Sequence, residues 1–205
     1  MKRIEFVAND EGIKACWEAC LKDCEQAEEI LREQGDYSVL SDCARNVLYY
    51  CENFVQFDFL INQAYTASKR IAECIHEHPR LLFQIKQVQL EALQEAELQS
   101  GHPLNITDDL RAELSQLHSN IQAADEGRFG DIKIDSMLKR DPVEWTKAFE
   151  DVVDEVEHEV YEKLIDIPRG MGFCFAYWAA RREAFQKRGI EWRSPQQMNP
   201  RVMFD

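Results

Sequence analysis

Two Glu-x-x-His motifs are the residues whose types and spacing most directly suggest chemistry in this sequence. Glu73 and His76 form the first motif, and Glu155 and His158 form the second. In di-iron carboxylate bundles such motifs project inward from two helices and meet a glutamate from each of two others. Here the surrounding apolar patterns place Glu73 and His76 on the outer side of their helix, and His158 almost opposite the apolar stripe of its own helix. We therefore expect both motifs to face water, and they predict neither a metal centre nor a cofactor.

Three thiols follow one another at four-residue spacing along one predicted helix, at Cys16, Cys20 and Cys24. Soft thiolates in a bundle core can hold Cu(I), and the spacing resembles that of four-helix copper-storage proteins. Such proteins line several helices with thiols, whereas the predicted helices between residues 80 and 166 carry none. Packing as small buried hydrophobes is the favoured interpretation, and a thiolate metal site is the minor alternative. The odd number of cysteines, seven, also favours free thiols over a disulfide framework.

A carboxylate and three arginines are the candidates for a ligand site. Asp58 flanks the apolar stripe of its predicted helix, so we expect it to be half-buried with a polar partner or to act as a perturbed acid. Arg169 lies before a predicted helix N-terminus, where exposed amides can hold an anion, and Arg181 and Arg182 follow on that helix. These residues would form an anion-binding pocket only if Asp58 and an arginine line one cavity.

A long apolar seam dominates the elements that must position these residues. Its spacing alternates between three and four residues, which keeps one side of a helix apolar when helices supercoil around each other. The seam comprises Leu40, Cys43, Val47, Tyr50, Phe54, Phe57, Ile61, Ala64, Ser68, Ile71 and Ile75. The pattern predicts one continuous helix from about Ser38 to Glu77, roughly 60 Å long.

Further helices are predicted on both sides of this seam. We expect them at 10–33, at 80–99, from 107 onward, from about 142 to 166, and at 171–188, where an all-round apolar pattern predicts a central buried helix. The predicted fold class is therefore all-α: a helical bundle of about six helices with long antiparallel, heptad-patterned elements. Residues 1–188 would form the bundle, and residues 189–205 a C-terminal tail packed on it.

Charge and hydropathy exclude some classes of partner. The sequence has 38 acidic and 24 basic residues, a net charge of −14, and such an acidic protein is a poor match for nucleic acid. Residues 169–205 are the exception, with seven arginines and lysines against three acids. No apolar run approaches the roughly 20 residues of a membrane span, and the first residues lack a signal-peptide core. The expected location is the cytoplasm.

The apolar patterns of the sequence predict the fold class more clearly than they predict a reaction or a ligand. The leading hypothesis is a non-catalytic cytoplasmic protein that binds a protein partner or forms a homo-oligomer, without a cofactor, nucleic acid or membrane. The alternative is a protein or enzyme that binds an anionic small molecule in an inter-helical pocket, with Asp58, Arg169, Arg181 and Arg182 as ligand contacts. No catalytic residue can be named from the sequence.

Overall fold

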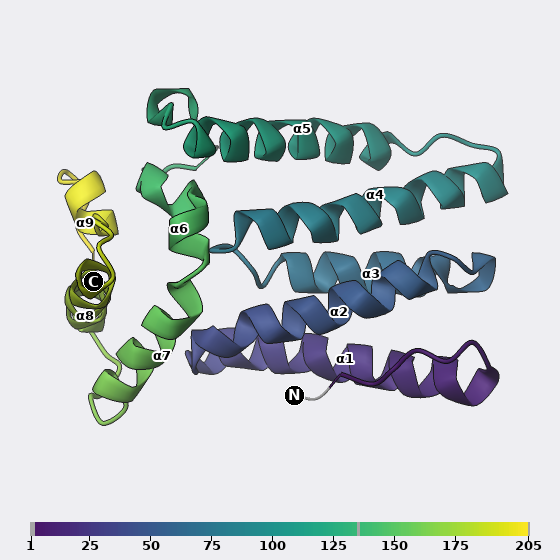
Figure 1. Ribbon diagram of the computed structural model, residues 1–205, viewed down its shortest axis with the longest axis horizontal. Helices are drawn as coiled ribbons and strands as arrows, with labels where there is room; N and C mark the ends of the chain where they lie inside the picture. The colour runs from purple at the N-terminus through teal and green to yellow at the C-terminus, as the bar shows by residue number, and fades with distance from the viewer. Residues whose placement is uncertain (1–2, 135, 205) are drawn as a thin grey trace. The chain divides into compact units, whose positions relative to one another are not determined.

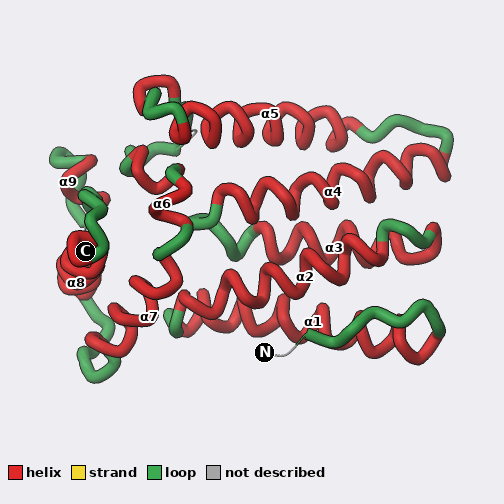
Figure 2. The backbone as a smooth tube through the Cα atoms, in the orientation of Figure 1, coloured by secondary structure: helices red, strands yellow, loops and turns green. Residues whose placement is uncertain are grey.

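The computed structural model describes residues 3–134 and 136–204, and in this part of the chain helices and loops occur without a strand (Figures 1 and 2). The predicted all-α fold is confirmed. The chain divides into two compact units. Unit 1 contains Met1–Gly35 and Val39–His118, and unit 2 contains Asp36–Ser38 and Ser119–Asp205. Among the described residues, no helix combines the length and apolar character needed to cross a membrane.

Unit 1 is an array of antiparallel helices that follow one another in sequence (Figure 1). It comprises α1 (Asp10–Glu33), α2 (Leu40–Phe54), α3 (Ile61–Ala72), α4 (Pro79–Ser100) and the first part of α5 (Asn105–Asp125). Helix α1 packs on α2, α2 on α3, and α3 on α4. The predicted bounds of the first helix are confirmed.

The predicted continuous helix over the long seam is wrong. Helix α2 ends at Phe54, a short 3-10 turn follows at Asp58–Leu60, and α3 begins at Ile61 and packs back against α2. Phe57 takes an extended conformation, with φ −127° and ψ 118°, which breaks the helix. A hairpin of two helices can keep the same seam spacing when the turn preserves its phase, so periodicity alone did not reveal the break.

Small residues form much of the core of unit 1 and bring the helices close together. Cys24 donates from Sγ to the carbonyl oxygen of Ala67 at 3.8 Å, and Cys51 donates to that of Ala64 at 3.5 Å. These contacts join α1 and α2 to the backbone of α3. The thiols therefore fill the space between closely packed helices, as small hydrophobes with a weak donor do.

Unit 2 is built from shorter helices. They are the 3-10 turns Phe129–Asp131 and Pro142–Trp145, and α6 (Lys147–Glu150), α7 (Val153–Leu164), α8 (Phe173–Lys187) and α9 (Pro195–Met198). The single helix predicted from about 142 to 166 is split, because Thr146 is extended and caps α6 by accepting a hydrogen bond from the amide of Phe149.

Helices α6, α7 and α8 share one apolar core with the start of the tail. Its buried members are Phe149, Val153, Val156, Val160, Leu164, Ala180, Ala184, Phe185, Ile190 and Trp192. The prediction that 171–188 forms a central buried helix is wrong, since residues 171–179 are half-buried or exposed. Further along the tail, the Asn199 side chain bonds to the backbone of Lys139 through both of its polar atoms. The predicted domain boundary at residue 188 stays a prediction.

Candidate functional site

The two Glu-x-x-His motifs face away from the helix cores, as predicted. Glu73, His76, Glu155 and His158 are all exposed. Within residues 3–134 and 136–204, no group of three or more His, Cys, Asp or Glu side chains is arranged to hold a metal ion. His158 instead contacts Asp36 at 2.7 Å, and this contact raises the pKa of the imidazole.

The thiols of α1 are completely buried. Cys16, Cys20 and Cys24 are free cysteines with no exposed surface. A hydrogen bond donated to Cys20, together with burial, raises the pKa of the Cys24 thiol, and burial together with the nearby Asp23 carboxylate raises the pKa of Cys43 to about 12. A buried thiol with a raised pKa is a poor nucleophile and a poor metal ligand, because both roles require the thiolate. The geometry therefore favours packing for these residues.

The four predicted ligand contacts lie in different surroundings. Asp58 is exposed in the α2–α3 turn, so the predicted half-burial is wrong: the chain leaves the helix before the position that would flank the seam. Asp58 belongs to unit 1, and the three arginines belong to unit 2. Arg182 is exposed, and Arg169 is exposed with its guanidinium 5.2 Å from the ring centre of Phe173.

Arg181 is the centre of a buried polar cluster in unit 2. Its Nε lies 2.8 Å from Oε1 of Glu157, and the two side chains are 6% and 4% exposed. The hydroxyl of Tyr177 donates to Oε2 of Glu157 at 2.6 Å. The guanidinium also lies near four ring centres, at 4.8 Å from Trp192, 5.4 Å from Phe185, 5.7 Å from Phe149 and 5.9 Å from Tyr177. Because rings and carboxylate enclose the cation, Arg181 stabilises the core and is closed to a ligand.

A second buried carboxylate fixes the tail to the same core. Oε1 of Glu144 accepts a hydrogen bond at 2.8 Å from the indole nitrogen of Trp192, and Oε2 accepts one from Arg140. Next to it, Asp141 accepts from the backbone nitrogen and the guanidinium of Arg193. These bonds satisfy carboxylates that would be costly to bury without partners.

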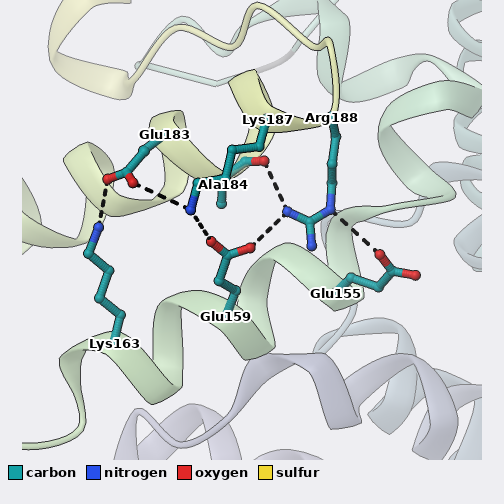
Figure 3. A network of polar contacts seen from close by, with 7 residues as sticks. All are labelled: Glu155, Glu159, Lys163, Glu183, Ala184, Lys187 and Arg188. Atoms are coloured by element: carbon teal, nitrogen blue, oxygen red, sulfur yellow. Dashed lines mark hydrogen bonds and ion pairs between the residues drawn. The ribbon is translucent and has the colours of Figure 1, made fainter.

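Exposed ion pairs connect α7 to α8 along one side of the helix pair (Figure 3). Lys163 contacts Glu183 at 2.6 Å, and Glu159 contacts both Lys187 at 2.7 Å and Arg188 at 2.9 Å. Hydrogen bonds from Lys187 and Arg188 lower the pKa of Glu159. Single exposed pairs add little stability, but a connected set across two helices helps to fix their register.

The α7–α8 turn carries exposed apolar side chains. Ile165, Ile167, Met171 and Phe175 are 55%, 42%, 94% and 39% exposed. We call these four residues the turn surface. The Phe175 ring contacts Trp178, which in turn contacts the Phe204 ring of the tail at a centroid distance of 5.1 Å. Large exposed apolar groups that gather in this way are typical of an interaction surface.

A cavity of about 410 Å³ lies within unit 1, where α3, α4 and the start of α5 face one another. We call it the α3–α5 hollow. Its lining is Tyr65, Lys69, Ala72, Glu73, His76, Leu82, Lys86, Gln89, Ile106, Asp109, Leu110 and Glu113. The sequence pattern did not predict this hollow, because it assigned the residues of α2 and α3 to one continuous helix and therefore left no separate helix to form one side of a cavity.

Comparison with known proteins gives no match for this chain among family models, curated proteins or solved structures.

Proposed function

We propose that this protein is a non-catalytic binding protein that acts on a protein partner through the turn surface of unit 2. The observation that carries the proposal is the concentration of four large exposed apolar side chains, Ile165, Ile167, Met171 and Phe175, in eleven residues. Interface anchors are commonly aromatic residues and methionine, which are enriched at the centres of protein interfaces.

The core behind the turn surface supports this role. The buried Glu157–Arg181 pair and the exposed ion pairs of Figure 3 both join α7 to α8. A surface on a fixed helix pair loses little conformational entropy on binding, which favours affinity. The buried carboxylates Glu144 and Glu157 bond to other residues of unit 2, so they support the fold of this helix pair.

Charge indicates the kind of partner. Asp166 and Arg169 both lie within the turn, and the segment 169–205 that begins there carries seven arginines and lysines against three acids. A net basic segment next to an apolar surface favours a partner segment with acidic residues beside apolar anchors. The proposed partner is therefore another protein with an acidic, amphipathic segment, and a second copy of this chain is the competing outcome.

Site-specific photocrosslinking tests this proposal. A p-benzoylphenylalanine residue is placed at Met171 or, as the control, at Leu98, which is 75% exposed in unit 1. In cells that make the protein, we expect an adduct with one identifiable protein from position 171 and none from position 98. The purified partner should then bind the Phe175→Ala variant about tenfold more weakly, the effect of losing roughly 1.4 kcal/mol at an anchor.

The outcomes separate the alternatives. Equal binding by the Phe175→Ala variant, equal adducts at both positions, or no adduct at 171 would contradict the proposal. An adduct that joins two copies of this chain would replace the foreign partner with self-association. Leu98→Ala is the matched truncation and should leave the affinity unchanged.

A further inference from the structure

The α3–α5 hollow combines an apolar lining with unpaired polar groups. Leu82, Leu110 and Ile106 supply apolar surface, and Tyr65 and Ala72 extend it. Its volume of about 410 Å³ falls in the range of about 300–1,000 Å³ that is common for small-molecule sites. The hollow is therefore large enough for a small organic molecule.

A buried acceptor lies in the lining. The Gln89 residue is 7% exposed, and its Oε1 accepts no hydrogen bond from any described residue. A buried amide oxygen without a donor has lost its hydrogen bonds to water without a replacement, so native proteins rarely leave one unused. A ligand that donates a hydrogen bond at this position would satisfy it.

The charged groups of the hollow occupy opposite walls. Lys86 on α4 and Glu113 on α5 form an ion pair at 2.8 Å, with the Lys86 side chain 14% exposed. Lys69 on the α3 wall and Asp109 on the α5 wall form no ion pair with a described residue. Glu73 and His76, which follow the end of α3, also line the hollow. The hollow thus offers one unpaired cation and unpaired carboxylates facing a common space.

We propose that the α3–α5 hollow binds a small zwitterion with an apolar side chain, either a free amino acid or a short peptide. The carboxylate of the ligand would pair with Lys69, and its ammonium would pair with Asp109 and donate to Oε1 of Gln89. The side chain would pack on Leu82 and Leu110. This site lies in unit 1 and does not depend on the proposed function of the turn surface.

Four related probes test the ligand class by calorimetric titration of the full chain. L-leucine carries both charges, N-acetyl-leucine lacks the ammonium, and leucinamide lacks the carboxylate. We expect leucine or dileucine to bind at least about tenfold more tightly than either singly charged probe, since each of these probes loses one charge-assisted hydrogen bond to the site. Preference for leucine or for dileucine would distinguish a free amino acid from a peptide.

Variants locate the binding site. Asp109→Asn removes an exposed carboxylate of the hollow, and Gln89→Met removes the buried acceptor at similar size. The matched controls are Asp42→Asn on α2 and Gln87→Met, an exposed glutamine on α4. We expect both hollow variants to weaken binding by about tenfold and both controls to leave it unchanged.

Any one of three results would overturn the inference. It is overturned if neither leucine nor dileucine binds at millimolar concentration, if N-acetyl-leucine binds as well as leucine, or if the controls weaken binding as much as the hollow variants. If Gln89→Met fails to fold, the exposed Asp109→Asn variant alone decides the outcome, with backbone NMR shifts mapping the bound probe to the lining residues.

Discussion

Replacing Glu157 with glutamine tests whether its pair with Arg181 is a structural element of unit 2. The substitution leaves the guanidinium charged, 5% exposed and without its carboxylate. Removing one partner of a buried ion pair costs about 3–5 kcal/mol, because the other charge stays buried. The four aromatic rings around Arg181 still stabilise the cation, so we expect a loss near the lower limit, about 3 kcal/mol.

Chemical and thermal unfolding of the full chain, followed by tryptophan fluorescence and circular dichroism, measures this loss. A change of about 3 kcal/mol should lower the melting temperature by about 6–12 °C in a domain of this size. The control is Glu159→Gln, whose carboxylate is half-exposed in its pairs with Lys187 and Arg188 and should change the free energy of unfolding by less than about 1 kcal/mol.

A triple replacement separates charge burial from side-chain packing. Glu157→Met, Arg181→Met and Tyr177→Phe together remove these three polar groups and keep similar volumes. We expect this variant to unfold within about 1 kcal/mol of the native protein, since an apolar replacement of a whole buried pair is often neutral or stabilising. The reasoning is refuted if Glu157→Gln is no more destabilising than Glu159→Gln.

Two further predictions follow from the titratable groups. At pH 8, a thiol reagent should label the partly exposed Cys174 in the native protein but label Cys43 only on unfolding, because burial raises the pKa of Cys43 to about 12. Peptide mapping after alkylation measures which cysteines are labelled. Fast labelling of Cys43 in the native protein would contradict the prediction. The hydrogen bond to Asp36 raises the pKa of His158 above its usual 6.5, and the bonds that Asp36 makes with Ser38 and His158 hold the pKa of Asp36 below its usual 3.8 despite burial. The contact between the two charged side chains therefore stabilises the fold at pH values between these two pKa values. This stabilisation fades as pH rises through the raised histidine pKa and is lost as pH falls through the lowered carboxyl pKa. His158→Gln should therefore lower the free energy of unfolding at pH 5.5 and have little effect at pH 9, with His102→Gln as the exposed control; an equal effect at both pH values would contradict this assignment.

Local signals in the sequence predicted the helices with clear ends. The first helix has an asparagine N-cap at Asn9 that accepts from the amide of Gly12, and a terminal turn near Gly35, so its predicted bounds are those of the structure. The α2–α3 break lacks such signals. No glycine or proline lies between Phe54 and Ile61, and the turn keeps the apolar phase, so tertiary packing of the hairpin decides where the helix ends.

The candidate site was harder to predict, because Glu157, which pairs with Arg181 in the buried cluster, lies at the edge of the apolar stripe of its helix. Glu157 lies roughly 90° from the centre of the apolar stripe on its helical wheel, a position that the sequence alone cannot assign to core or solvent. Its burial depends on Arg181, Tyr177 and the rings of another helix, none of which is near it in sequence. The outward direction of the Glu-x-x-His motifs was predictable because their residues lie far from their apolar stripes.

The assignment of Asp36–Ser38 to unit 2 has a consequence for the order in which the protein forms during synthesis. The preceding and following residues, Gly35 and Val39, belong to unit 1, yet Asp36 contacts His158, 122 positions later in the chain. Helices α1 to α4 can pair as they leave the ribosome, since most of their contacts join helices that are neighbours in sequence and the others join helices only one element apart. The short connection between α1 and α2 cannot form the Asp36–His158 contact until α7 has been translated, so it stays exposed to solvent until then. A ribosome stalled before α7 should therefore display a nascent chain whose first inter-helix loop is open to proteolysis, and that sensitivity should disappear once translation is complete.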